Sequence, residues 1–130
     1  MGFDVAPLYA LPVAAIYLTL WFRVSAMRSA AGISIGDGGN PLLLRRIRQH
    51  GNCAEWTTFV LILLMLAEGT GAPALWLHVA GALLLAGRIA HPFGLVPGNA
   101  GHPLRLVGNG SNLLAALIVM ICIALALPGL

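Results

Sequence analysis

Four long stretches of the chain contain no charged side chain, and they dominate its hydrophobic pattern. They cover residues 5–22, 56–67, 69–87 and 106–130, with lengths of 18, 12, 19 and 25 residues. A helix needs about 20 mostly apolar residues to cross a bilayer, and three of the stretches reach or approach that length. The pattern predicts an all-α integral membrane protein. Its four-helix bundle would have spans over about residues 6–25, 42–68, 73–91 and 104–127.

Proline, glycine and asparagine mark the boundaries between these helices. Asn40 and Pro41 follow a glycine-rich loop and suit an N-cap and the first position of a helix. A tight turn is expected at residues 69–72, and the third helix is expected to end near Pro92. The four helices and their connections account for residues 1–130 as a single transmembrane domain.

Composition excludes most other classes of protein. Only 8% of the residues are charged and 59% are hydrophobic, whereas soluble domains carry about 25% charged residues. A soluble enzyme, a disordered tail, a disulfide scaffold and a nucleic-acid-binding protein are therefore excluded. The high isoelectric point, about 9.5, does not indicate nucleic acid, because arginine-bearing loops on one side of a bilayer account for it.

The arginines predict the orientation of the chain in the membrane. All seven basic residues are arginines, and they lie in or beside the first and third connections: Arg23, Arg28, Arg45, Arg46, Arg48, Arg88 and Arg105. The two chain ends and the turn at residues 69–72 carry none. Because cytoplasmic loops are enriched in basic residues, we expect both arginine-bearing loops in the cytoplasm and both termini on the opposite side.

Several polar residues within the expected spans need an explanation, since an ionisable group inside a membrane is costly. At 100° per residue, one face of the second helix, spanning about 80°, carries two arginines, an amide and a carboxylate: Arg45, Arg48, Asn52 and Glu55. Arg88 and His91 share a face of the third helix. Arg105 lies in the first turn of the fourth helix, where the helix dipole favours anions. These groups predict a cationic pocket with one embedded carboxylate.

Structural explanations compete with this interpretation. Glu55 could simply pair with Arg48, and the other arginines could extend to lipid head groups. His78 is expected to be packed or hydrogen-bonded, and Cys53 to be a small apolar filler. No metal site is predicted, because the histidines lie on different elements and no His-x-x-His or Cys-x-x-Cys spacing occurs.

Separate motifs resemble the MAPEG family, the membrane-associated proteins in eicosanoid and glutathione metabolism. The run RQHGNCAEW at residues 48–56 resembles the family signature. GRIAH at residues 87–91 resembles the third-helix motif, and PLRL at residues 103–106 resembles the start of the fourth helix. The loop GDGGNP at residues 36–41 resembles bacterial members, which implies a bacterial inner membrane.

The resemblance implies a homotrimer that binds glutathione between neighbouring subunits, on the cytoplasmic side. One subunit would hold the tripeptide through Arg48, Asn52 and Glu55, with Arg28 as a further contact. The neighbour would contribute Arg105, Arg88 and His91. Arginines suit the two carboxylates of glutathione and Glu55 its ammonium group. Arg105 would hold the thiolate as the catalytic residue, which attacks an electrophile or reduces a peroxide arriving from the lipid.

The chain departs from family members that conjugate lipid mediators, and this keeps other functions open. Where those members carry aromatic hydroxyl groups near glutathione, this chain has His91, Leu95 and Trp56, and no tyrosine follows Tyr17. One alternative is a non-catalytic membrane scaffold that binds glutathione or lipid. Another is a small multidrug-type transporter, although Glu55 is surrounded by arginines rather than open to a cationic substrate.

Overall fold

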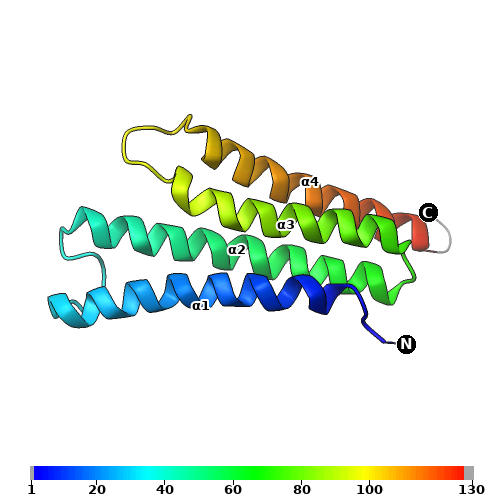
Figure 1. The fold of residues 1–130 in the computed structure, drawn as a ribbon, viewed down its shortest axis with the longest axis horizontal. Helices are drawn as coiled ribbons and strands as arrows, with labels where there is room; N and C mark the ends of the chain where they lie inside the picture. The colour runs from blue at the N-terminus through cyan, green and yellow to red at the C-terminus, as the bar shows by residue number, and fades with distance from the viewer. Residues whose placement is uncertain (1, 128–130) are drawn as a thin grey trace.

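The computed structural model describes residues 2–127, which form four helices in an up-and-down arrangement (Figure 1). They are α1 (Ala6–Ala31), α2 (Pro41–Gly69), α3 (Ala74–Gly94) and α4 (Pro103–Ala126). Each is long and apolar enough to cross a membrane, which confirms the all-α prediction with four spans. The loops at residues 32–40 and 95–102 lie at one end of the bundle, here called the loop end. The start of α1, the α2–α3 turn and the end of α4 lie at the other, the turn end (Figure 1).

Local hydrogen bonding explains where the loop-end helices begin and end. The side chain of Asn40 accepts from the backbone N–H groups of Leu42 and Leu43 at 3.0 and 3.1 Å, which confirms the predicted N-cap. Helix α1 runs six residues past the expected span, to Ala31, and the left-handed backbone of Gly32, with φ of 65°, terminates it. Arg28 then donates to the carbonyl of Gly36 at 2.7 Å and holds the loop against the end of its own helix.

The sequence predicted that α3 ends near Pro92, and the helix continues two residues beyond it, to Gly94. Proline normally interrupts a helix because it lacks an N–H donor and crowds the preceding turn. Here tertiary contacts hold the last turn in place. Gln49 on α2 donates to the carbonyl of Pro92 at 2.7 Å. A Cβ at Gly94 would overlap the backbone of Arg105, so α3 and α4 are closely packed beyond the proline.

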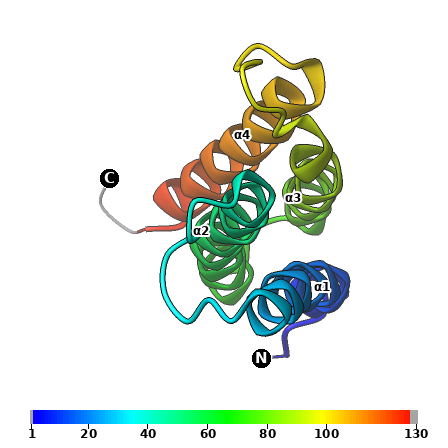
Figure 2. The same ribbon diagram turned by 90° about the vertical axis from the view of Figure 1, so that its left-hand side faces the viewer.

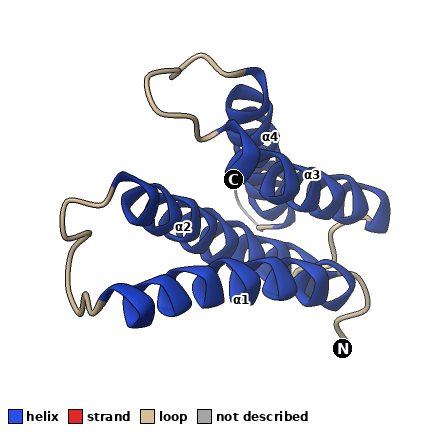
Figure 3. Ribbon diagram, turned by 60° about the vertical axis from the view of Figure 1, so that its left-hand side comes forward, coloured by secondary structure: helices blue, strands red, loops and turns tan. Residues whose placement is uncertain are grey.

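The helices form two pairs that share a narrow core. Figure 2 shows α1 and α4 on opposite sides of the bundle, with α2 and α3 between them. The α3–α4 pair diverges from the α1–α2 pair toward the loop end (Figure 3). Fully buried apolar side chains fill the space where the pairs meet: Val13, Val60, Leu64, Leu84 and Val119. Most other large apolar side chains remain exposed on the outside of the bundle, as expected of surfaces that face lipid.

The turn end is held together by a carboxylate that the sequence analysis did not assign. Glu68, near the end of α2, accepts from the backbone N–H groups of Asp4, Val5 and Ala6 at 2.6, 2.7 and 2.8 Å. These are donors at the start of α1 that no intrahelical carbonyl can satisfy. Nearby, the hydroxyl of Tyr9 lies 3.0 Å from His78 Nδ1, which confirms that His78 is hydrogen-bonded.

Candidate functional site

Two of the predicted glutathione residues are bonded to each other inside one chain. The Arg88 side chain is 1% exposed. Its Nη1 donates to the carbonyl and to the side-chain Oδ1 of Asn52, at 3.1 and 2.8 Å. Its Nη2 donates to the carbonyl of Gly108 at 3.4 Å. Arg88 on α3 therefore links α2 to α4 and fixes the orientation of the Asn52 side chain.

His91 and Arg105 lie beside this link, where α3 and α4 cross. His91 is buried, and its Nδ1 has no hydrogen-bond partner among residues 2–127. Gly108 permits the crossing, since an added Cβ would stand only 2.6 Å from the Cβ of His91. Arg105 follows in the first turn of α4 and is half-buried. The structure thus places both residues near the loop end of the α3–α4 pair.

Arg48 and Glu55, unlike Arg88 and His91, do not lie in the buried part of the bundle. Both are exposed on the surface of the single chain, although they lie on the same side of α2 as Asn52. Arg28 is engaged with the loop carbonyls of Ile33 and Gly36. One chain therefore brings only part of the predicted set together, and it leaves Arg48 and Glu55 open to a neighbouring molecule.

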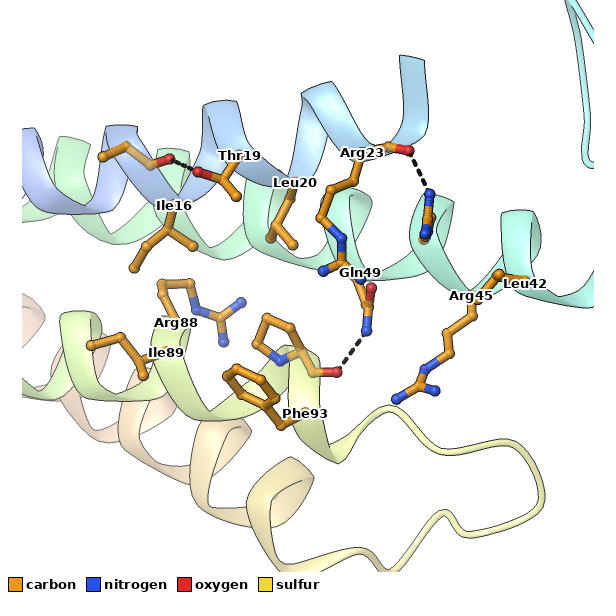
Figure 4. Close-up of a pocket in the computed structure, with 13 residues that line it drawn as sticks. Ile16, Thr19, Leu20, Arg23, Leu42, Arg45, Gln49, Arg88, Ile89 and Phe93 are labelled. Atoms are coloured by element: carbon orange, nitrogen blue, oxygen red, sulfur yellow. Dashed lines mark hydrogen bonds between the residues drawn. The ribbon is translucent and has the colours of Figure 1, made fainter. Parts of the chain in front are cut away.

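A cavity of about 440 Å³ opens between α1, α2 and α3 at the loop end (Figure 4). Among the predicted residues, only Arg45 and Arg88 line it. The polar lining is completed by Thr19, Arg23, Arg46 and Gln49. The sequence analysis did not associate these residues with a site, and Gln49 in particular was overlooked. Its spacing of four residues from Arg45 places both on one side of α2 and could have indicated it.

A second buried amide also escaped the sequence analysis. Asn112 on α4 is fully buried, and its side chain donates to the carbonyl of Gly108, the same carbonyl that Arg88 contacts. The signal was present, because an amide inside a 25-residue charge-free stretch needs a partner in the bundle. The predicted structural role of Cys53 is confirmed, because its side chain is buried. Within residues 2–127, no group of three potential metal-ligating side chains is found.

Comparison with known proteins bears on this site. The profile of the MAPEG family matches residues 6–125. The chain is 36% identical over 90 residues to the inner membrane protein YecN of Escherichia coli strain K12, which covers 69% of each chain. The YecN protein of Escherichia coli O6:H1 (strain CFT073) matches with the same identity and coverage, and no solved structure matches. The four spans and these relatives support an inner membrane location. Matched along nearly its whole length, the chain belongs to the MAPEG family.

Proposed function

We propose that this protein is a membrane enzyme that binds glutathione between the subunits of a homotrimer and transfers it to, or uses it to reduce, a lipophilic substrate. Membership of the MAPEG family suggests a glutathione-related membrane function. The observation that carries the proposal is the exposure of Arg48 and Glu55 on one side of a membrane helix. Glu55 lies at the centre of α2, where a charged group costs about 2.5–3.5 kcal/mol on insertion scales, so it requires a polar partner.

A tripeptide with two carboxylates and an ammonium group matches these side chains. Arg48 would bind a carboxylate and Glu55 the ammonium, while Asn52 offers an amide whose position Arg88 already fixes. Arg28 would add a further contact from the same subunit, and the neighbouring subunit would add Arg105, with His91 beside it. Because Arg88 is committed to Asn52 and Gly108, we assign it a positioning role rather than a direct contact.

Small side chains on the outside of α3 support a neighbour at close range. Ala82 and Ala86 are exposed and lie one turn apart, and such residues allow membrane helices to approach closely. A trimer packed in this way would cover surfaces that a single chain leaves open. The arginine-rich loop end would face the cytoplasm and both termini the periplasm, as the distribution of arginines predicts.

The chemistry requires the sulfur of glutathione as a thiolate. A guanidinium and a helix N-terminus both lower the pKa of a thiol, and Arg105 in the first turn of α4 combines the two. In a transfer, the thiolate forms a carbon–sulfur bond and the leaving group departs with its electron pair. In a reduction, it attacks a hydroperoxide, the O–O bond breaks to give an alcohol and a sulfenic acid, and a second glutathione yields the disulfide and water.

Glutathione binding by the detergent-solubilised protein tests the proposal. We expect glutathione to raise the melting temperature and to show thiolate absorbance at neutral pH. Arg105→Ala should abolish the absorbance, and Glu55→Gln should weaken binding. S-methylglutathione is the matched ligand control, because it should stabilise the protein without absorbing as a thiolate. Arg23→Gln is the matched variant, since it removes a loop-end arginine that lies outside the proposed site. A protein that glutathione neither stabilises nor ionises would refute the proposal.

A non-catalytic scaffold that keeps the ligand is the second candidate, and the tyrosines favour it. The rings of Tyr17 and His50 lie 4.8 Å apart between α1 and α2, and Tyr9 is hydrogen-bonded at the turn end. Both tyrosines lie on α1, which within one chain makes no contact with α4 and its Arg105. Turnover of activated aryl halides or lipid hydroperoxides separates the enzyme from the scaffold. A transporter would instead take up a lipophilic cation in exchange for protons.

A further inference from the structure

We infer that the cavity between α1, α2 and α3 is a binding site for an anionic phospholipid, separate from the proposed glutathione site. Its mouth is lined by Arg23, Arg45 and Arg46, which come from two helices that meet at the loop end (Figure 4). Its volume of about 440 Å³ lies within the range of about 300–1,000 Å³ that small-molecule sites occupy.

The polar groups of the cavity are built into the fold and are incompletely satisfied. Gln49 and Arg88 are 4% and 1% exposed. The Oε1 of Gln49 and the Nε of Arg88 have no hydrogen-bond partner among residues 2–127, and the same is true of the Nε atoms of Arg45 and Arg46. In Figure 4 the side chain of Arg23 extends from α1 across the cavity toward Gln49. Among residues 2–127, the side chains of Arg23 and Arg45 donate no hydrogen bond and that of Arg46 donates one, to the carbonyl of Arg23. The guanidinium groups of these three residues therefore keep donors for an anion.

The rest of the lining is apolar, which specifies the remainder of the ligand. Ala15 and Ile16 on α1 line the cavity together with Ile89 and Phe93 on α3, and the side chain of Ile16 points toward α3 (Figure 4). Ile16 and Ile89 lie further from the loop end than Arg23 and Arg45 do, and the buried Arg88 lies beside them (Figure 4). A ligand that satisfies both parts has a phosphate at one end and a hydrocarbon chain at the other. Basic pockets between membrane helices bind anionic lipid head groups in this way.

The cavity is distinct from the proposed glutathione site. Gln49 follows Arg48 directly and so points about 100° further round α2. Neither Glu55 nor Arg105 lines the cavity. The two sites therefore share α2 and the buried Arg88 but differ in the rest of their lining. A lipid in the cavity would fix α1 against α3 at the loop end, where the two helix pairs diverge (Figure 3).

Native mass spectrometry and thermal melting of the purified full-length protein test this inference. Dioleoyl phosphatidylglycerol should bind to saturation at one molecule per chain and raise the melting temperature. Phosphatidylcholine with the same chains should bind more weakly, since it carries no net charge. Removing one arginine should weaken binding about fivefold, and Arg23→Gln combined with Arg46→Gln about 25-fold. Ala15→Phe should fill the apolar part and weaken binding with every charge retained.

Arg48→Gln is the matched control, because it removes an exposed arginine outside the cavity. It should leave lipid binding unchanged while it weakens glutathione binding, and the double arginine variant should do the reverse. Equal binding of the two phospholipids, or full binding by the double variant or by Ala15→Phe, would overturn the inference. The inference would also be overturned if oleate or inorganic phosphate stabilised the protein and phosphatidylglycerol did not. A protein that binds this lipid but not glutathione would refute only the proposed function.

Discussion

Replacing Gly108 with alanine should destabilise the protein, although alanine is the better helix former. The new Cβ would stand 2.6 Å from the Cβ and 2.9 Å from the Cα of His91. Carbon atoms in contact are normally about 3.5–4.0 Å apart, so α3 and α4 would have to separate by roughly 1 Å. The neighbouring atoms cannot rotate away, because they belong to the backbone and the first side-chain carbon of His91.

Gly110 provides the matched control on the same helix. A Cβ there meets no atom within 4 Å. Both substitutions gain the same helix propensity, about 1 kcal/mol, so this gain cancels when the variants are compared. The remaining difference is the cost of overpacking, about 1–3 kcal/mol. Gly110→Ala should therefore be more stable than the wild type, and Gly108→Ala should be less stable than Gly110→Ala by about that amount.

Reversible unfolding in mixed detergent micelles, followed by circular dichroism, measures both free energies of unfolding. The hydrogen bond from Arg88 to the carbonyl of Gly108 is 3.4 Å long and should also be lost when the helices separate. If Gly108→Ala were as stable as Gly110→Ala, the close crossing of α3 and α4 would not be a determinant of this fold.

Three further substitutions test individual hydrogen-bonded groups. Glu68→Gln should cost about 1–3 kcal/mol and speed amide exchange at residues 4–6, because a neutral amide accepts more weakly than a carboxylate from their backbone N–H groups; unchanged exchange would contradict this role. Arg88→Lys should lower the free energy of unfolding by about 1.5–3 kcal/mol, since an ammonium cannot reproduce the fork between Asn52 and α4, and a lysine variant of wild-type stability would refute it. Asn40→Ala should cost about 1 kcal/mol by removing the N-cap of α2, measured in the same unfolding assay, where no loss would be the opposing result.

The sequence by itself determined the membrane character and the helical layout of this protein. Three of the four charge-free stretches reach or approach the length needed to cross a bilayer, and this relation depends on no tertiary contact. The start of α2 was equally predictable, because Asn40 bonds to backbone groups two and three residues away. The motif at residues 48–56 indicated the family. Such features depend on neighbours along the chain, and a linear pattern is sufficient to record them.

Only the tertiary structure decided which polar residues meet. Arg88 and Asn52 are separated by 36 positions in the sequence, and Glu68 contacts backbone groups more than 60 positions away. Their pairing depends on how the helices pack and how far each is rotated, which a helical face drawn from one segment cannot specify. The continuation of α3 through Pro92 has the same origin, because a contact from Gln49 on another helix helps to hold that turn. Local hydrogen bonding and hydrophobicity define the helices, whereas the packing between them defines the sites.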